Sequence, residues 1–183
     1  MLYPPPGKYR LCVADYEVLA ASGAFGDRRT ELIDGEVFVK PPHFRRRAFI
    51  RAELTHRFRH ALEEQASLYY ACSASILFGP HDMPQPDILL TNEPYGDGPV
   101  PAASIGLVIE TADETIADYL DDRDKFYARA AIPEYWVVDV SGRMIHQLWQ
   151  PEAGAYTQRH ALAFDQPIAA ITLPGLSIAT TGL

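Results

Sequence analysis

Three short apolar runs between residues 84 and 139 place the strongest limit on the fold. DILL begins at Asp87, IGLVIE ends at Glu110, and YWVVDV follows Pro133. The middle run is apolar on both faces, which is typical of a central strand covered on both sides. Residues 115–131 form a helical pattern between the second and third runs. This order of elements predicts an α/β or α+β sandwich with a mixed sheet flanked by helices.

Turn residues predict two hairpins and one further strand around these runs. Asp34-Gly35 lies between two alternating apolar segments in TELIDGEVFV, and this dipeptide favours a type I′ hairpin turn. Ser141-Gly142 separates YWVVDV from RMIHQLW, which predicts a second hairpin. We expect the tail, residues 170–178, to add one edge strand.

The longest predicted helix covers residues 44–65. Four apolar residues at i, i+4 spacing form its buried stripe: Ile50, Leu54, Phe58 and Leu62. The segment 40–59 holds Lys40 and six arginines against one acid, Glu53, in a chain whose net charge is −8. Arg47 and Arg51 lie off the stripe, so we expect them to face solvent. Either they form a plain solvated face, or Arg46, Arg47 and Arg51 contact the phosphates of a nucleic acid.

Length and cysteine content restrict the class of protein. With 183 residues the chain is long enough for a single domain with a real core, and residues 1–10 read as an extended, proline-rich arm. Cys12 and Cys72 are far apart, which argues against a disulfide framework or a structural zinc site. There is no apolar run of about 20 residues. The first residues lack a signal-peptide pattern, so we expect a cytoplasmic location without membrane contact.

Two carboxylates at strand borders are the best candidates for chemistry. Twenty-two residues separate Asp87 from Glu110, and fourteen separate Glu110 from Lys125. On neighbouring strands, the two acids and the carbonyl of Thr111 offer the oxygen ligands that Mg²⁺ prefers. Such a metal lowers the pKa of a bound water and polarises a phosphate. Lys125 would then orient that water or stabilise charge on the phosphate oxygens.

Each acid also has an ordinary structural interpretation. Asp87 can simply cap a strand after a proline, and Glu110 can be a charge at a strand exit. In the predicted helix, Asp118, Asp121 and Lys125 share one stripe. Another stripe joins four further positions of this helix: Tyr119, Arg123, Phe126 and Ala130. The functional interpretation therefore rests on the acids and the lysine taken together.

Several motifs together resemble a known family, the Uma-type putative restriction endonucleases of bacteria, within the PD-(D/E)XK nuclease superfamily. The resemblance covers roughly residues 10–180. It is carried by QPD at 85–87, Glu110, the DxxxK pattern at 121–125, Tyr127, EYWVVD at 134–139, ELIDGEV at 31–37 and LPGL at 173–176.

The resemblance implies a restriction-endonuclease-like fold with an αβββαβ-type core, an N-terminal hairpin and C-terminal strands. It also implies Mg²⁺ or Mn²⁺, no organic cofactor, and hydrolysis of phosphodiester bonds in DNA. Asp87 and Glu110 match the metal-binding acids. Lys125 matches a lysine on the following helix, since Ala112 stands at the superfamily's usual lysine position. Glu31 matches an N-terminal acid near the metal, although it can equally be an ordinary strand glutamate.

Two departures keep a second hypothesis open. Arg47 stands about where the family often has a histidine, and Asp113-Glu114 replaces a common Ser-Pro. The first hypothesis is a Mg²⁺-dependent DNA endonuclease, which we expect to be a homodimer because cutting both strands needs two active sites. The second is a catalytically inactive nuclease-fold protein that serves as a binding or assembly module.

Overall fold

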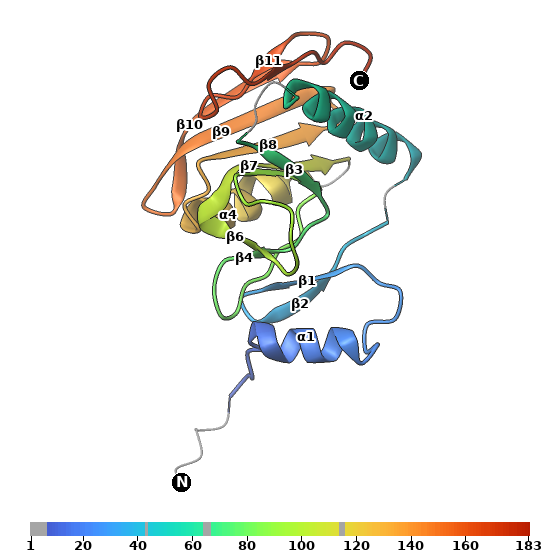
Figure 1. Cartoon of the computed structure of the whole chain (residues 1–183), viewed down its shortest axis with the longest axis vertical. Coiled ribbons are helices and arrows are strands. Elements are labelled where there is room, and N and C mark those ends of the chain that lie inside the picture. Colours follow the sequence, from blue (N-terminus) through green and yellow to red (C-terminus); the bar gives the residue numbers. More distant parts are fainter. Residues whose placement is uncertain (1–6, 43, 64–66, 114–115) are drawn as a thin grey trace.

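One six-stranded mixed sheet forms the centre of the molecule (Figure 1). The computed structural model describes residues 7–183 except 43, 64–66 and 114–115. The strand order is β10-β9-β8-β7-β5-β3, in which only β7 and β8 run parallel. The predicted mixed sheet is confirmed. Its strands are β3 (Tyr69–Cys72), β5 (Ile88–Thr91), β7 (Ile105–Ala112), β8 (Glu134–Asp139), β9 (Met144–Glu152) and β10 (Ala155–Ala163).

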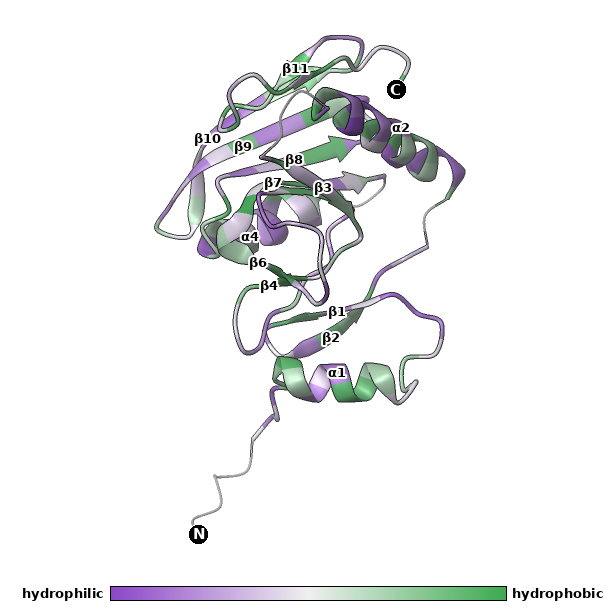
Figure 2. Ribbon diagram, in the orientation of Figure 1, coloured by the Kyte–Doolittle hydropathy of each residue, from purple (hydrophilic) through white to green (hydrophobic). Residues whose placement is uncertain are grey.

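The central strands carry a hydrophobic core on each face of the sheet. In β8, Trp136 and Val138 pack with the residues of α2 (Arg45–Ala61), whereas Tyr135 and Val137 pack with those of α4 (Asp124–Arg129). Alternate side chains of a strand point to opposite faces, so an apolar residue at every position buries both. Figure 2 shows β8 as a strongly hydrophobic strand beside the mixed colours of α2. In β7, Leu107 and Ile109 lie in the first core and Val108 in the second, so the prediction that this run is a central strand covered on both sides is confirmed.

The long helix α2 forms as predicted, from Arg45 to Ala61, and residues 64–65 of the predicted range lie outside the described chain. All four residues of the predicted stripe are buried in one core: Ile50, Leu54, Phe58 and Leu62. The stripe presses the helix against the sheet, so the side chains at its N-terminal end lie beside one edge of the central strands.

A smaller N-terminal unit lies below the sheet in Figure 1. It consists of α1 (Val13–Ala21) and the antiparallel hairpin of β1 (Thr30–Ile33) and β2 (Glu36–Val39). Asp34 and Gly35 have φ of 51° and 75°, the left-handed pair that a type I′ turn requires, so the predicted hairpin is confirmed. Leu32 anchors the hairpin by pairing with Met83 and by packing in a third small core.

The C-terminal tail differs from the prediction. β12 (Ser177–Ile178) pairs with β11 (Ile168–Ala169) and does not join the six-stranded sheet as an edge strand. Gly175, at φ 83°, helps to reverse the chain between them. Ile168, Leu176 and Ile178 then pack into the core that α2 shares. A second short pair, β4 (Ile76–Leu77) and β6 (Val100–Pro101), precedes the single-turn η1 (Ala102–Ser104).

The predicted helix after β7 is present but irregular. It comprises α3 (Ile116–Asp118), the π-helical turn η2 (Tyr119–Arg123) and α4, while residue 115 lies outside the described chain. A π turn rotates the side chains that follow it relative to a regular α-helix. In the helices that the structure describes, no segment has both the length and the apolar character needed to cross a membrane.

Candidate functional site

Three buried acids meet at the ends of two inner strands of the six-stranded sheet. Glu31 comes from β1, Asp87 immediately precedes β5, and Glu110 belongs to β7, with exposed fractions of 1%, 0% and 0%. The pairing of Ile88 with Ile109 places Asp87 and Glu110 one step further along two antiparallel neighbours. By strand alternation both side chains point to the α4 side of the sheet. The prediction that the two acids lie on adjacent strands is confirmed.

Asp87 is held by a threonine and an arginine. Its Oδ2 accepts hydrogen bonds from the backbone N–H and the hydroxyl of Thr111, at 2.9 and 2.5 Å. Arg47 Nη2 donates to the same oxygen at 3.1 Å, and Arg47 Nε donates to the Thr111 hydroxyl at 2.9 Å. Arg47 also reaches the hydroxyl of Tyr119 at 3.4 Å. These buried hydrogen bonds from Thr111 and Arg47 fix the orientation of the Asp87 carboxylate.

The prediction that Arg47 faces solvent is wrong, since only 6% of the residue is exposed. The reason is its place in the first turn of α2, where the side chain can extend past the apolar stripe to the sheet edge. Burial alone would lower the pKa of Arg47, but Asp87 raises it, and the net direction is upward. Arg47 is therefore a permanent cation beside Asp87.

Glu110 is surrounded by a lysine, a tyrosine and an arginine. Lys40 Nζ lies 3.3 and 3.5 Å from its two carboxylate oxygens. The Tyr127 hydroxyl donates at 3.1 Å, and Arg123 Nη1 lies 3.8 Å away. Burial raises the pKa of Glu110 above its ordinary value, and the Lys40 ammonium only partly offsets this. The carboxylate is therefore a stronger base than an exposed glutamate.

Lys40 links Glu110 to Glu31 and to the backbone of Gln85. Besides Glu110, its ammonium donates to the backbone carbonyl of Gln85 at 2.7 Å and lies 4.0 Å from Glu31 Oε2. Its side chain is 2% exposed. The backbone N–H of Lys40 donates to the carbonyl of Arg29 across the end of the β1–β2 hairpin. Sequence reasoning counted Lys40 only within the basic segment and missed it as a site residue.

Arg123 fills the place that was predicted for Lys125. Both Nη atoms of Arg123 bond to Glu31, with Nη1 at 3.1 Å from Oε2. Burial would lower the pKa of Arg123, but Glu110 and Glu31 raise it. Lys125 lies on the exposed side of α4 and makes no ion pair within the described part of the chain, so the structure does not place it beside Asp87 and Glu110 as we expected.

The signal for Arg123 was present in the sequence. It shares the stripe of Tyr119, Phe126 and Ala130, and this stripe packs toward the sheet while Lys125 does not. The helical pattern placed Arg123 on this stripe without assigning it a role. Its position on that face is what brings it to the acids.

The three acids fit a hard divalent cation by donor chemistry, because Mg²⁺ prefers carboxylate and carbonyl oxygens. Three cationic side chains compete with a metal for these oxygens: Lys40, Arg47 and Arg123. Among the residues that the structure describes, no group of three or more acids, histidines and cysteines has the arrangement to hold a metal ion. The cluster as it stands is charge-balanced by the protein's own side chains.

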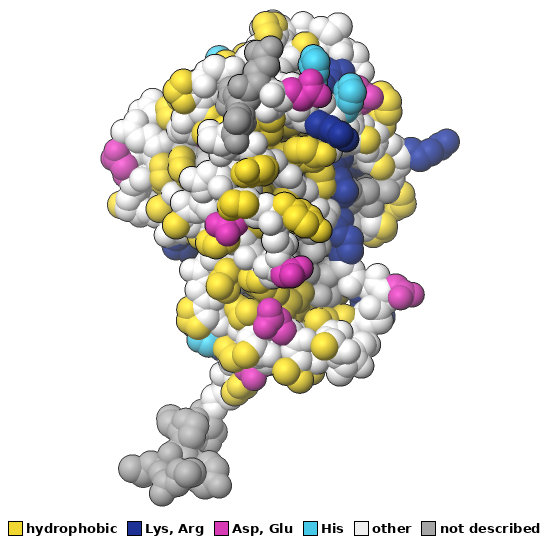
Figure 3. Space-filling model, viewed as in Figure 1, with side chains coloured by type: hydrophobic (Ala, Val, Ile, Leu, Met, Phe, Trp, Pro, Cys, Tyr) yellow, Lys and Arg dark blue, Asp and Glu magenta, His cyan; other side chains and the backbone are white. Residues whose placement is uncertain are grey.

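The outer face of α2 carries the remaining predicted arginines. Arg46 is exposed, and Arg51 is partly buried. Arg51 lines a cavity of about 530 Å³ between α2 and β3, together with Arg59 and Tyr70. Figure 3 shows Lys and Arg side chains in a column at the level of α2 and below it. Arg46 and Arg51 thus belong to the basic outer part of α2.

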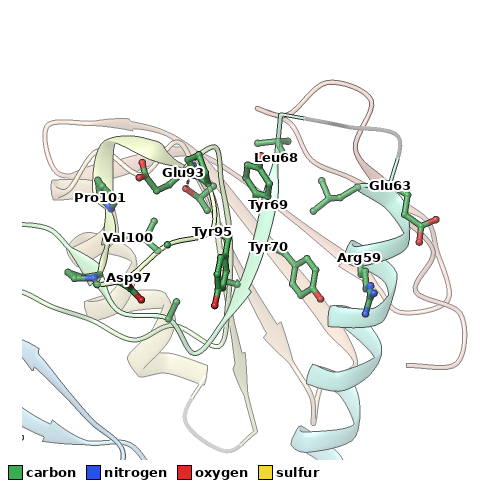
Figure 4. Close-up of a pocket in the computed structure, with 18 residues that line it drawn as sticks. Arg59, Glu63, Leu68, Tyr69, Tyr70, Glu93, Tyr95, Asp97, Val100 and Pro101 are labelled. Atoms are coloured by element: carbon green, nitrogen blue, oxygen red, sulfur yellow. Dashed lines mark hydrogen bonds between the residues drawn. The ribbon is translucent and has the colours of Figure 1, made fainter.

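A second cavity of about 790 Å³ lies where the end of α2 meets β3 and the loop after β5 (Figure 4). Tyr69, Tyr70 and Tyr95 point into it or along its rim, and Arg59 stands at its α2 side. The three buried acids are not among its lining residues. The aromatic cavity and the acid cluster are therefore separate features of the molecule.

A mixed sheet with helices on both faces, and with paired acids at the edge of its central strands, defines the class of restriction-endonuclease-like nuclease folds. Residues 13–181 match the family Uma2, described as "Putative restriction endonuclease", and the chain belongs to this family. The fold is similar to the crystal structure of a putative nuclease belonging to DUF820 from Anabaena variabilis ATCC 29413. That likeness has a TM-score of 0.58 at 16% identity and covers 86% of each chain. No curated protein matches the chain.

Proposed function

We propose that this protein hydrolyses phosphodiester bonds in DNA with Mg²⁺ or Mn²⁺. One observation carries the proposal: Asp87, Glu110 and a lysine ammonium lie together at the edge of two neighbouring strands in a nuclease-family chain. Two carboxylates can hold a divalent metal, and an amine can stabilise negative charge on phosphate oxygens. The amine is supplied by Lys40 from the N-terminal hairpin, in place of the predicted Lys125.

The residues of the cluster have separate roles in this proposal. Asp87 and Glu110 would hold the metal, which lowers the pKa of a bound water when it is present. Arg123 would stabilise the negative charge that develops on the phosphate oxygens, and so would the Lys40 ammonium from a position beside the metal, once it no longer contacts Glu110. Thr111 keeps Asp87 oriented, as Tyr127 does for Glu110.

The basic face of α2 supports DNA as the substrate. The rest of the chain is net acidic, so a polyanion is attracted chiefly to the segment that contains Arg46 and Arg51. The first turn of α2 also carries Arg47, which touches Asp87. The N-terminal end of α2 is therefore the place where this basic helix comes nearest to the acid cluster.

Cleavage of plasmid and of single-stranded DNA by the full chain, with Mg²⁺ or Mn²⁺, tests the proposal. Asp87→Asn and Glu110→Gln should each lower the rate by at least about 10²-fold. The matched controls Asp121→Asn and Glu17→Gln change exposed acids and should cleave like the wild type. The proposal is wrong if the site variants cleave at the wild-type rate.

A second candidate is a nuclease-fold binding or assembly module without turnover. It is favoured by the closure of the cluster, in which three buried acids are neutralised by three side-chain cations. This candidate predicts DNA binding, measured by fluorescence anisotropy, with no metal-dependent cleavage. Sedimentation of the free and DNA-bound protein would test the proposed homodimer.

A further inference from the structure

The polar contacts of the Lys40 ammonium are of the kind that a metal ion makes. Those that the structure shows are all to oxygens: the Gln85 carbonyl at 2.7 Å, both oxygens of Glu110 at 3.3 and 3.5 Å, and Glu31 Oε2 at 4.0 Å. Carboxylates and a backbone carbonyl are also the ligands that a hard divalent cation selects. A compact ammonium and such a cation therefore compete for one position.

The other two cations are bound differently. Arg47 divides its guanidinium among Asp87, Thr111 and Tyr119, and both Nη atoms of Arg123 bond to Glu31. These planar forks are fixed by several directed hydrogen bonds. Lys40 instead places a point charge at the end of a flexible four-carbon stem. Its backbone stays tied to Arg29 when the side chain moves, so the ammonium can leave without disturbing the hairpin.

The net charge of the cluster determines when a divalent ion can replace the Lys40 ammonium. With Lys40 in place, the three acids and three cations of the cluster cancel. If a divalent ion replaces the ammonium, the cluster gains one positive charge. A phosphodiester carries one negative charge, so the metal and the substrate phosphate together restore neutrality. A buried charge without compensation is strongly unfavourable, which couples departure of Lys40 to arrival of both ligands.

We propose that Lys40 is a built-in counter-ion that occupies the metal position of the acid cluster, and that a divalent metal binds by displacing its ammonium. This inference rests on the proposed metal-dependent function and adds a control of metal affinity to it. The ammonium keeps the acids paired and the site closed until metal and substrate are both present.

Binding of Mn²⁺ to the full chain, followed by electron paramagnetic resonance, tests this inference without measuring cleavage. Lys40→Met removes the competing charge and should bind Mn²⁺ at least about tenfold more tightly than the wild type. Mn²⁺ should also raise the Tm of Lys40→Met more than that of the wild type, since a ligand stabilises the state it binds. The matched control Lys125→Met removes an exposed lysine and should bind Mn²⁺ like the wild type.

The possible results separate the two proposals. Equal Mn²⁺ affinity in wild type and Lys40→Met, lost in Asp87→Asn, would refute the role of Lys40 while leaving the metal-dependent function standing. No Mn²⁺ binding by any folded variant would refute both.

A second variant with an uncharged side chain keeps the test valid if Lys40→Met fails to fold. Lys40→Gln keeps a donor for the Gln85 carbonyl and should also gain Mn²⁺ affinity. If neither neutral variant folds even in excess Mn²⁺, Lys40 serves only the fold and the inference is wrong.

Discussion

Glu110 and Glu134 are both completely buried, on the neighbouring parallel strands β7 and β8, yet their partners differ in kind. Glu110 is held by Lys40 and Arg123 and by one tyrosine hydroxyl. Glu134 receives five hydrogen bonds from neutral donors: Trp136 Nε1 at 2.6 Å, Gln147 Nε2, the backbone N–H groups of Ile171 and Thr172, and the Thr172 hydroxyl. Among the described residues, no cation forms an ion pair with Glu134.

The difference distinguishes a structural acid from one that can do chemistry. The donors to Glu134 belong to the backbone and to packed side chains, and they fasten the C-terminal segment to the sheet. The partners of Glu110 are long side chains with charges that a metal or a phosphate can replace. Burial alone therefore does not identify a functional carboxylate, whereas the type of its counter-groups does.

The largest expected change in the free energy of unfolding comes from replacing Glu134. Glu134→Leu removes the acceptor of five donors, and each buried donor without a partner costs about 1–3 kcal/mol. We expect the free energy of unfolding to fall by on the order of 5 kcal/mol, and the Tm by roughly 10–20 °C in thermal unfolding. Glu134→Gln keeps one acceptor oxygen and should lose less. A change below about 1 kcal/mol would show that water replaces the carboxylate, and the proposed contrast with Glu110 would fail.

The next largest change in stability is expected when Glu110 is replaced. Glu110→Gln leaves Lys40 buried without its main partner, and breaking a buried ion pair costs about 3–5 kcal/mol. Adding Lys40→Met to this variant should restore part of the loss, with a coupling energy of about 1–3 kcal/mol in a double-mutant cycle by chemical denaturation. Strict additivity would mean that the two side chains do not stabilise each other.

Arg47 and Arg46, one residue apart on α2, give a direct test of buried against exposed charge. Arg47→Ala should destabilise the protein by about 2–3 kcal/mol, because it removes charge-assisted hydrogen bonds to Asp87 and Thr111. Arg46→Ala should change stability by less than about 0.5 kcal/mol. If α2 binds DNA, Arg46→Ala should flatten the slope of log affinity against log salt by about one unit. Similar stability losses in both variants would contradict the buried position of Arg47.

The smallest effect is expected for Lys125. Lys125→Ala removes an exposed side chain and should alter the free energy of unfolding by less than about 0.5 kcal/mol. Its part in catalysis stays a prediction from the family resemblance. A cleavage assay decides it: an unchanged rate removes Lys125 from the site, while a loss of activity without loss of stability would assign it a role that its position does not show.

The strands and their acids were predictable, whereas the long-range contacts of the cations were not. The positions of Asp87 and Glu110 follow from local patterns, because short apolar runs define strands and strand pairing sets which side chains share a face. Lys40 reaches Glu110 from 70 residues away, and nothing in its local sequence indicates this contact. Arg123 reaches Glu31 across 92 residues of sequence, whereas Lys125 was assigned from its spacing after Glu110 and from the family resemblance.

The sequence separation of these contacts has a consequence for folding and local opening. Lys40 and Glu110 lie 70 residues apart, and Glu31 and Arg123 lie 92 apart. Such distant contacts form late, because much of the chain must be ordered before they can close. The β1–β2 hairpin, which supplies both Glu31 and Lys40, should therefore dock after the sheet has assembled. Its detachment would then be a partial unfolding event of lower free energy than global unfolding, visible as faster amide hydrogen exchange in β1 and β2 than in β7 and β8.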